Sequence, residues 1–340
     1  MHARILDLAE WLPAQVLAND ELAALYPEWS ADKILAKTGI RARRLAAPGE
    51  TAADLAAAAA ERLFAQGVVA RAEIDFILLC TQAPDYLLPT TACVLQERLG
   101  IARSAGALDF NLGCSGFVVG LSLAKGLVES GAARRVLLLT ADTYSKYIHA
   151  QDRSVRTLFG DGAAATVVGA ADAAAPDGQA IGPFVFGTDG RGAHDLIVAT
   201  GGARHARDAA SGVAQLDANG NLRSRDDLYM NGAEVFAFSL REVPKAIDAL
   251  LDKAGLAKDD IDYFVLHQAN RFMLDALRKK IGVAPEKLPI HMEDVGNTVS
   301  STIPLTLIRM RAAGQLRPGA RLMLVGFGVG YSWAATILQL

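Results

Sequence analysis

Cys114 is the residue of this sequence whose surroundings are best suited to chemistry. It stands in the stretch Leu112-Gly113-Cys114-Ser115-Gly116, after a short apolar run and before a long apolar segment. This arrangement predicts a strand-to-helix turn with the thiol at the helix N-terminus, where unpaired N–H groups lower the thiol pKa. A thiolate held among small neighbours can accept an acyl group. Most lone cysteines are buried structural residues, so this interpretation requires partner residues elsewhere in the chain.

Three later segments supply candidate partners for the thiol. His267 ends an apolar run, Asn297 lies in a Gly-Asn-Thr turn, and 326–330 is a glycine-rich turn between the last two expected strands. Taken singly, the histidine is more often structural and the asparagine an ordinary turn residue. Together they offer a nucleophile, two neutral hydrogen-bonding groups and backbone N–H groups that could bind a carbonyl oxygen.

Length, composition and charge restrict the class of protein. The 340 residues are 51% hydrophobic with a net charge of -3, as expected of a globular protein with a large core. No long basic stripe is present, which argues against a nucleic-acid partner. Cys80, Cys93 and Cys114 are too few and too far apart for a disulfide framework or a zinc site, which predicts a reduced, cytoplasmic protein without a metal. The charged N-terminus is unlike a signal peptide, and no apolar run is long enough for a membrane span.

Strands and helices are expected to alternate, which predicts a layered α/β fold. Expected strands cover 3–8, 74–80, 107–110, 135–141, 260–267, 322–325 and 333–338, and expected helices cover 32–37, 51–66, 91–99, 115–130, 231–251, 271–281 and 303–311. The helix after Cys114 is apolar and rich in small residues, so it is expected to pack centrally.

An internal repeat divides the chain. The stretch 73–83 resembles 260–269: each has an acidic-Ile-Asp-aromatic start, three apolar residues and then a polar residue. A second pair, 135–141 and 321–325, is separated by a similar distance, about half the chain. Two similar α/β halves, 1–170 and 171–340, are therefore predicted. Strand ends that face a common cleft are where such folds place their chemistry, and Cys114 and His267 both follow strands.

Four further segments have competing interpretations. Arg41, Arg43 and Arg44 form a basic cluster that is expected to be a solvated face, with phosphate binding as the alternative. Gly160-Asp161-Gly162 superficially suggests a phosphate loop, but it lacks the strand and helix context and is interpreted as a structural turn. Residues 170–178 are expected to connect the two halves, and 200–224 to form an irregular surface excursion.

In their order and spacing, these segments resemble the β-ketoacyl-acyl-carrier-protein synthase III family. The resemblance rests on Leu-Gly-Cys-Ser-Gly at 112–116, His-Gln-Ala-Asn at 267–270, Gly-Asn-Thr at 296–298 and the turn at 326–330, supported by Thr-Gly-Ile-Arg at 38–41 and Phe-Gly-Asp-Gly at 159–162. It extends over almost the whole chain. It implies a thiolase-like fold of five αβαβα layers with duplicated halves, and a homodimer.

The resemblance also implies a mechanism. Cys114 would take an acyl group from a thioester, while His267 and Asn297 would bind the thioester carbonyl of malonyl-acyl-carrier protein. Loss of carbon dioxide would then give an enolate that attacks the acyl-cysteine, a decarboxylative Claisen condensation. The backbone N–H groups of Cys114 and Val329 would form the oxyanion hole. No cofactor is implied.

The remaining site residues are carried over from the same family. The resemblance implies that Arg153 packs on the adenine of coenzyme A, that Phe159, Met230 and Phe236 line the acyl channel, and that Leu88 enters the partner's acyl pocket. Lys37 and Asn270 complete the substrate-binding set. The segment Gln268, Ala269, Asn270, Arg271 and Phe272 would contact the carrier protein, and Arg278, Lys279 and Lys280 supply positive charge nearby. These three cations could equally be an ordinary solvated helix face.

Departures from the family pattern concern substrate choice. Lys33 takes the place of a tryptophan that stacks on adenine, Trp29 is displaced by four residues, and Lys37 replaces an arginine. Coenzyme A would then bind weakly or differently, which favours a carrier-bound acyl donor. Leu88 is smaller than the usual phenylalanine, which predicts room for longer or branched chains, and Val329 replaces a glycine. These changes predict a specialised paralogue rather than the primary initiator of fatty-acid synthesis.

Two other functions use the same residues differently. A plain acyltransferase would pass the acyl group from Cys114 to an alcohol or amine without decarboxylation. A non-catalytic partner subunit would keep the fold without the chemistry, but such a subunit has no need of a complete Cys/His/Asn set. A thiolase is disfavoured, because no cysteine follows Cys114 to serve as its late base.

Overall fold

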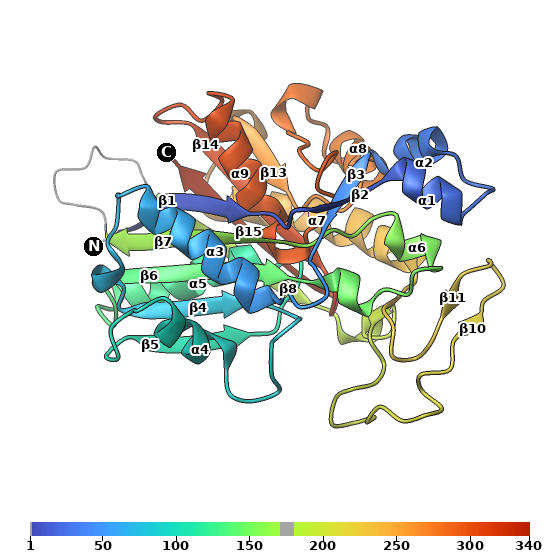
Figure 1. The fold of residues 1–340 in the computed structure, drawn as a ribbon. Coiled ribbons are helices and arrows are strands. Elements are labelled where there is room, and N and C mark those ends of the chain that lie inside the picture. The colour runs from blue at the N-terminus through green and yellow to red at the C-terminus, as the bar shows by residue number, and fades with distance from the viewer. Residues whose placement is uncertain (1, 171–179) are drawn as a thin grey trace.

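The computed structural model describes residues 2–170 and 180–340, which fold around two mixed β-sheets (Figure 1). The first sheet has the order β1 (Ala3–Trp11), β7 (Gly162–Ala170), β6 (Arg135–Asp142), β4 (Phe76–Cys80) and β5 (Gly106–Phe110). The second has the order β13 (Tyr263–Leu266), β14 (Arg321–Gly328), β15 (Ser332–Gln339) and β8 (Ala180–Thr188). The strands near the centre are almost wholly buried, which explains their continuous apolar sequences.

Three layers of helices enclose and separate the sheets. The first sheet is covered on its outer face by α3 (Ala52–Ala65) and α4 (Thr91–Arg98), and the second by α7 (Gly232–Ala254) and α8 (Arg271–Ile281). Between the sheets lie α5 (Gly116–Glu129) and α9 (Thr302–Ala312), each of which packs against strands of both. The predicted five-layer αβαβα arrangement is confirmed. Small residues on α5 allow this close packing, since a side chain at Gly120 would collide with Leu138.

The register of the two sheets confirms the internal repeat. In the first sheet β4 pairs in parallel with β6, with Phe76 opposite Val136. In the second β13 pairs in parallel with β14, with Tyr263 opposite Leu322, so the two pairs occupy equivalent places. The order β1-β7-β6-β4 likewise corresponds to β8-β15-β14-β13. As a result, the polar residues after β4 and β13 lie at equivalent ends of their sheets.

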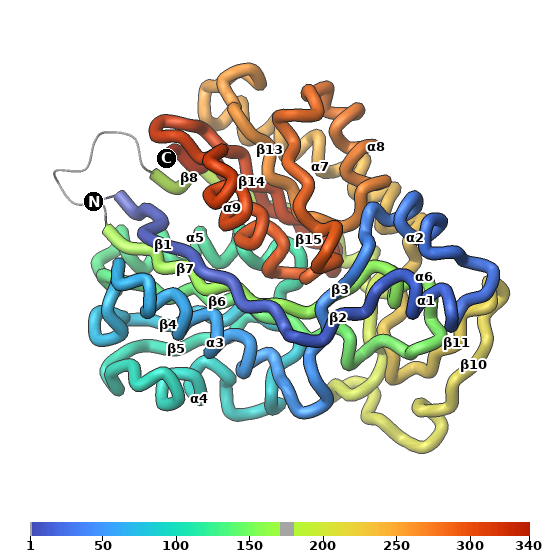
Figure 2. Tube along the Cα trace, turned by 45° about the horizontal axis from the view of Figure 1, so that its top comes forward, coloured from blue at the N-terminus to red at the C-terminus, as the bar shows by residue number. Residues whose placement is uncertain are grey.

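The remaining elements are short and gather at one end of the sheets (Figure 2). They are β2 (Gln15–Ala18), α1 (Asn19–Leu25), α2 (Ala31–Thr38), β3 (Ala42–Leu45), α6 (Arg153–Arg156), β9 (Leu196–Ile197), β10 (Gln215–Leu216), β11 (Leu222–Arg223) and β12 (Tyr229–Met230). The described residues also form the 3₁₀ turns η1 (Arg71–Glu73), η2 (Tyr144–Tyr147), η3 (Gly190–Gly192), η4 (Lys258–Asp260), η5 (Pro285–Lys287) and η6 (Val299–Ser301). The predicted excursion at 200–224 is confirmed, because β10 and β11 are its only regular structure in the described chain.

Several predicted elements need correction. The strand expected at 260–267 begins only at Tyr263, after η4. The glycine turn expected at 326–330 is shorter, because β14 continues to Gly328. The strand β8 was not predicted, since its Gly-Pro and second glycine are poor strand signals. The expected connection at 170–178 lies outside the described residues except for Ala170, which belongs to β7. Across residues 2–170 and 180–340, no helix has both the length and the apolarity of a bilayer span.

The arginine cluster is neither a solvated face nor a phosphate site as a unit. Arg43 is completely buried on β3 and donates to the carbonyl oxygens of Leu17 and Thr157 and to Asn19 Oδ1, at 3.2, 2.8 and 2.8 Å. Burial lowers the pKa of its guanidinium to about 10. Arg41, two residues earlier, is exposed and pairs with Glu293 at 3.3 Å. The sequence shows only the cluster, while burial on β3 removes Arg43 from solvent.

Candidate active site

Cys114 lies in the turn between β5 and α5, with only 5% of the residue exposed. Ser115 is the N-cap of α5, so the predicted strand-to-helix turn is present. Strand β14 passes directly beside it: a Cβ on Gly328 would lie 2.9 Å from the Cys114 Sγ. Gly326 is equally close to the backbone of Cys114 and Ser115. These two glycines let the second sheet approach the Cys114 thiol.

Burial dominates the electrostatics of the thiol. The backbone N–H groups of Cys114 and Val329 donate hydrogen bonds to Sγ, which lowers the thiol pKa. Desolvation and the nearby Asp142 carboxylate act in the opposite direction and together raise that pKa to about 12. The expectation of a low-pKa thiolate is therefore wrong for the free protein. The sequence shows the helix N-terminus but not the depth at which the thiol is buried.

His267 follows β13 and is also buried, with 2% of its surface exposed. Its Nδ1 lies 2.7 Å from the Thr302 Oγ1 on α9, and its ring packs edge-on against Phe327. Desolvation lowers the imidazole pKa to about 3. The ring is consequently neutral at physiological pH and acts as a neutral hydrogen-bonding group.

Asn297 is held in one orientation by a strained turn. Its backbone N–H donates to the Leu158 carbonyl at 2.9 Å, and its Oδ1 accepts from the Val299 N–H at 2.9 Å. Val299 has a φ of 55°, a conformation that a β-branched residue rarely adopts. Since Oδ1 is engaged, the Nδ2 amide is left as the free end of the side chain. Gly296, at a φ of 76°, fits where a Cβ would collide with the Leu158 carbonyl.

The structural interpretation of Gly160-Asp161-Gly162 agrees with this geometry. Gly160 donates its N–H to the Asn297 carbonyl and lies so close to the Val295 carbonyl that no Cβ would fit. The Asp161 carboxylate accepts from the backbone N–H groups of Ala46 and Ser145. The segment therefore holds the Asn297 turn in place rather than binding phosphate.

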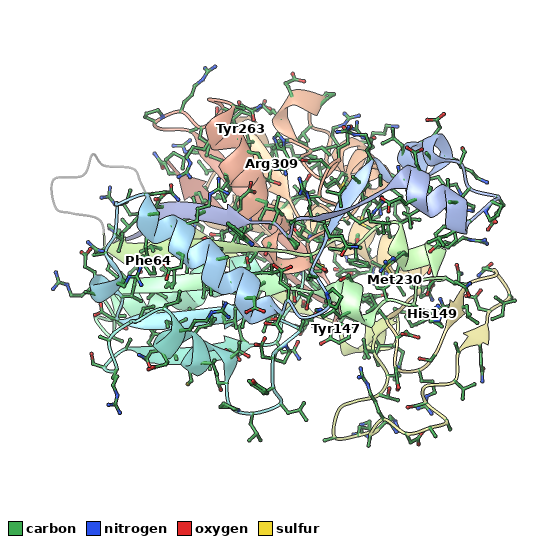
Figure 3. All side chains as sticks on the ribbon, viewed as in Figure 1. Phe64, Tyr147, His149, Met230, Tyr263 and Arg309 are labelled. Atoms are coloured by element: carbon green, nitrogen blue, oxygen red, sulfur yellow. The ribbon has the colours of Figure 1, made fainter. Side chains whose placement is uncertain are left out.

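One small cavity of about 70 Å³ brings the three candidate catalytic residues together. Cys114, His267 and Asn297 line it, and so do three of the predicted substrate-binding residues, Phe159, Met230 and Asn270. Met230 comes from β12, at the end of the molecule where the short elements gather (Figure 3). The polar groups are neutral at physiological pH, and the walls are otherwise mainly apolar. Such a site can stabilise negative charge that develops on a bound oxygen.

Four other predicted substrate residues lie outside this cavity. Lys37 and Arg153 gather around Trp29, with Lys37 Nζ 4.5 Å and the Arg153 guanidinium carbon 5.8 Å from the ring centre. Phe236 stacks on Phe272 at 5.2 Å. Leu88 is 82% exposed. The placement of Phe236 differs from that of an inner lining residue, because its ring faces the exposed Phe272.

The predicted carrier segment at 268–272 is only partly at the surface. Arg271 and Phe272 are exposed at the start of α8, and Asn270 is the N-cap, which accepts from the Met273 N–H at 2.8 Å. Gln268 is 1% exposed, and its amide nitrogen donates to the Leu266 carbonyl at 2.8 Å. Including Gln268 in a docking surface is therefore wrong. Ala269 is half-buried and packs against the core.

Comparisons with known proteins agree with this geometry. The family model described as 3-oxoacyl-[acyl-carrier-protein (ACP)] synthase III matches residues 108–190, and that described as 3-oxoacyl-[acyl-carrier-protein (ACP)] synthase III C terminal matches residues 251–340. The β-ketoacyl-[acyl-carrier-protein] synthase III of Caldanaerobacter subterraneus subsp. tengcongensis is 34% identical over 337 residues, 99% of this chain and 97% of that protein. The chain belongs to the β-ketoacyl-acyl-carrier-protein synthase III family.

Solved structures of synthase III proteins share the whole fold. A 3-oxoacyl-(acyl-carrier-protein) synthase III crystal structure is 65% identical, with a TM-score of 0.98 and 100% of both chains covered. The 3-oxoacyl-(acyl-carrier protein) synthase from Burkholderia xenovorans LB400 is 38% identical, with a TM-score of 0.91 and coverage of 100% of this chain and 94% of that one. The thiolase-like fold predicted from the resemblance is confirmed.

Sequence reasoning missed the residues that contact the His267 and Asn297 side chains. Thr302 contacts His267, and Val299 contacts both Asn297 and Thr302, whose Oγ1 lies 3.3 Å from the Val299 carbonyl oxygen. Both follow Asn297 within five residues, so the segment that carries Asn297 also supplies the Thr302 hydroxyl that contacts His267. No sequence pattern indicates this pairing, because β13 and α9 are brought together only by the fold.

The neutral state of His267 gives a testable titration. We expect the imidazole NMR signals of His267 to show no inflection near pH 6.5, since burial lowers its pKa to about 3. Between pH 3 and 6.5 the unfolded chain would bind this proton and the folded chain would not, so this residue's contribution to stability is lost as the pH falls. A chemical-shift titration with His267→Gln for assignment measures it. A midpoint near 6.5 would contradict the burial argument.

Proposed function

We propose that this chain forms an acyl-Cys114 intermediate and condenses it with malonyl-acyl-carrier protein, with loss of carbon dioxide, to give a β-ketoacyl thioester. One observation carries the proposal: the Cys114 thiol, His267 and Asn297 line the same buried cavity. Membership of the synthase III family supports the substrate class.

In the first half-reaction, Cys114 attacks the carbonyl carbon of an acyl thioester. The developing oxyanion accepts hydrogen bonds from the N–H groups of Cys114 and Val329, which already point at the thiol. The carbon–sulfur bond to the donor then breaks, and the thiol proton of Cys114 ends on the departing thiol. Because the free thiol is neutral, its deprotonation is coupled to binding of the thioester rather than completed beforehand.

In the second half-reaction, His267 and Asn297 bind the thioester carbonyl of the malonyl carrier. Carbon dioxide leaves and its bonding electrons form an enolate, whose oxygen is held by these two donors. The enolate carbon attacks the acyl-cysteine and forms the new carbon–carbon bond. The Cys114 sulfur departs and takes up a proton, which regenerates the thiol. Neutral donors suit this step, since they stabilise the enolate without protonating its carbon.

Thr302 is the residue that we expect to set the tautomer of His267. Its hydroxyl proton has two acceptors within reach, and Nδ1 at 2.7 Å is nearer than the Val299 carbonyl at 3.3 Å. Donation to Nδ1 places the ring proton on Nε2, from which it can reach the enolate oxygen. Thr302→Val is expected to slow malonyl decarboxylation by roughly tenfold to a hundredfold, while Thr302→Ser restores it.

Two measurements distinguish an effect of Thr302 on the orientation of His267 from an effect on folding. Cys114 acylation is expected to be far less affected than decarboxylation in Thr302→Val, and the ¹⁵N shifts of His267 should move from the Nε2–H to the Nδ1–H pattern. Undiminished decarboxylation in Thr302→Val, with an unchanged tautomer, would remove Thr302 from the mechanism.

Trp29 lies four residues before the position of the family's tryptophan, yet its ring lies beside the predicted coenzyme A residues Lys37 and Arg153. It precedes α2, and Lys33, Lys37 and Arg153 all lie over its ring, at 5.5, 4.5 and 5.8 Å from the centroid. An aromatic face beside three cations suits an adenine with neighbouring phosphates. This placement supports acyl-coenzyme A as a donor, whereas the departures at Lys33 and Lys37 taken alone favour a carrier-bound donor.

Trp29→Ala therefore distinguishes the two acyl donors. We expect the KM for acyl-coenzyme A to rise about tenfold, because an aromatic stacking partner is lost, while the KM for the acyl-carrier donor changes little. Steady-state acylation of Cys114 with each donor measures the two constants. Equal changes for both donors would mean that Trp29 acts on the fold rather than on adenine.

Helix α8 supports the proposed carrier-protein contact. Arg271 and Phe272 are exposed at its start, and Arg278, Lys279 and Lys280 occupy its last turn. An acidic carrier would be attracted to this helix by long-range electrostatics. Arg271 also contacts Gly39, the C-cap of α2, so this helix adjoins the Trp29 cluster through α2.

A homodimer is the expected assembly. Strand β5 is an edge of the first sheet, and Leu87, Leu88 and Leu108 near it are 91%, 82% and 45% exposed. An exposed edge strand is a template for pairing with another chain, and exposed apolar side chains that gather beside it favour an interface there. That Leu88 enters the partner's acyl pocket stays a prediction, and so does the division into halves at 1–170 and 171–340. The cytoplasmic location and the specialised pathway also stay predictions.

Product analysis tests the condensation directly. The full-length protein is incubated with an acyl-coenzyme A and with malonyl-acyl-carrier protein carrying a labelled free carboxyl group. We expect labelled carbon dioxide and a β-ketoacyl-carrier product in equal amounts, each requiring both substrates. Acyl transfer to an alcohol or amine without release of carbon dioxide would replace the proposal by a plain acyltransferase. Failure of every donor to acylate Cys114 would indicate a non-catalytic subunit.

A further inference from the structure

A second cavity, of about 330 Å³, lies on the other side of the turn after β14, which contains Val329 and Gly330. Leu196 and Leu228 contribute apolar surface, and one wall carries the polar side chains of Gln82, Asn111, Tyr144 and Tyr147. Tyr147 comes from η2 and is visible near the middle of the molecule (Figure 3). This chamber is much larger than the cavity at Cys114 and opens beside a further hollow lined by Thr200 and Arg207.

The chamber adjoins the nucleophile through the turn that precedes it. Gly113 lies against Gln82 and Val329: a Cβ there would be 2.6 Å from Gln82 Oε1 and 2.8 Å from Val329 Cγ1. Val329 lines the chamber and also donates its N–H to the Cys114 thiol. The catalytic cavity of about 70 Å³ has little room for an acyl chain in addition to the malonyl thioester. Cys114 itself does not line the larger chamber, so a long acyl chain on the thiol would have to pass Val329 to reach it.

The polar wall is a hydrogen-bond relay with a definite direction. Tyr144 is 4% exposed, and within residues 2–170 and 180–340 the only partner of its hydroxyl is Gln82 Oε1. A buried hydroxyl proton needs an acceptor, so Gln82 must present its oxygen to Tyr144. Gln82 Nε2 then donates to Asn111 Oδ1 at 2.9 Å. Because the Asn111 Oδ1 faces Gln82, the Asn111 Nδ2 is on the side of the amide away from Gln82.

The backbone of Gln82 keeps the relay in place. Its N–H donates to Asp142 Oδ1 at 2.8 Å, and its carbonyl accepts from the Tyr147 hydroxyl at 3.4 Å. Nothing in the described chain accepts a hydrogen bond from the Asn111 Nδ2, although its Oδ1 is occupied. Asn111 is exposed, so its two Nδ2 N–H groups are hydrated in the free protein, and the relay ends in these two donors at the chamber wall. Their natural complement is an oxygen acceptor on the ligand.

We infer that this chamber selects acyl thioesters whose chain carries an oxygen acceptor, a hydroxyl or keto group, which Asn111 Nδ2 binds. The inference rests on the proposed function, because it needs an acyl group on Cys114. A plain alkyl chain would pack against Leu196 and Leu228, but it would displace the water bound to the Asn111 N–H groups. It has no oxygen to replace the hydrogen bonds that this water accepted. A site built around such a donor discriminates against the analogue that lacks the acceptor.

Matched thioesters test this selectivity. Hexanoyl-coenzyme A and its 3-hydroxy, 5-hydroxy and 3-oxo derivatives are offered to the full-length protein, and the rate of Cys114 acylation is followed by intact-protein mass. We expect at least one oxygenated derivative to acylate Cys114 about tenfold faster than hexanoyl-coenzyme A, as judged by kcat/KM. Equal rates for all four thioesters, or a preference for the unsubstituted chain, would overturn the inference.

Two variants connect the selectivity with the relay. Asn111→Leu removes the donor and is expected to reduce the ratio of rates to about one, whereas Gln215→Leu, an exposed amide on β10, leaves the ratio unchanged. Tyr144→Phe frees Gln82 to turn over and is expected to lower the ratio severalfold without removing Asn111. A ratio that survives Asn111→Leu would assign the selectivity to other residues. Absence of any acylation in the wild-type protein would instead refute the proposed function itself.

Discussion

Replacing Cys114 by alanine is expected to abolish both the acyl-enzyme and the condensation. The thiol is the only proposed acyl acceptor, and loss of a covalent nucleophile commonly lowers kcat by roughly a thousandfold or more. The side chain is small and lies among glycines, so the change to alanine removes the sulfur without a large disturbance of packing. Intact-protein mass after incubation with an acyl thioester is the measurement, with peptide mapping to locate the adduct.

The other two cysteines provide the controls for this experiment. Cys93 is exposed on α4, away from the cavity, and Cys93→Ser is expected to retain full acylation. Cys80 is buried, donates its S–H to the Leu112 carbonyl at 2.8 Å, and has a pKa raised well above its ordinary value by burial. It is therefore unsuited to accept an acyl group. An adduct that persists in Cys114→Ala would contradict the assignment of the nucleophile.

The architecture was accessible from the sequence where one physical signal dominated. Buried parallel strands read as continuous apolar runs, and α8 was predicted with its observed bounds because asparagine caps its start and a glycine with φ of 70° ends it. The strand β8 was missed because Gly182, Pro183 and Gly187 weaken its pattern, although pairing with β15 supplies the stability that propensity lacks. Tertiary pairing overrode local preference there.

The site was accessible in its residue types but not in its electrostatics. Cys114, His267 and Asn297 could be selected from their places after strands and in a turn, and the structure brings them to one cavity. The thiol pKa was predicted in the wrong direction, because burial outweighs the helix terminus. Gln268 and Phe236 were misplaced for a related reason: sequence indicates proximity along the chain, whereas the side-chain direction depends on packing.

The proposed enolate-binding pair, His267 and Asn297, provides a sharper test of the mechanism than the proposed nucleophile does. His267→Ala and Asn297→Ala are each expected to lower malonyl decarboxylation by roughly a hundredfold to a thousandfold, the usual loss when one oxyanion donor is removed. Both residues are placed in the second half-reaction, so acylation of Cys114 is expected to persist in both variants. Single-turnover mass measurement reports the acylation, and release of labelled carbon dioxide reports the decarboxylation.

A histidine outside the cavity serves as the matched control for this pair. His291 is half-buried and its pKa is lowered by desolvation, but it does not line the catalytic cavity, so His291→Ala is expected to keep both half-reactions. The proposed mechanism gives this contrast a physical basis. In it, His267 and Asn297 act only when charge develops on the malonyl thioester oxygen, whereas the N–H groups of Cys114 and Val329 serve the acyl transfer. Parallel loss of acylation and decarboxylation in His267→Ala would show that His267 also takes part in acylation of the Cys114 thiol. The proposal that the two half-reactions use separate oxygen-binding sites would then be wrong.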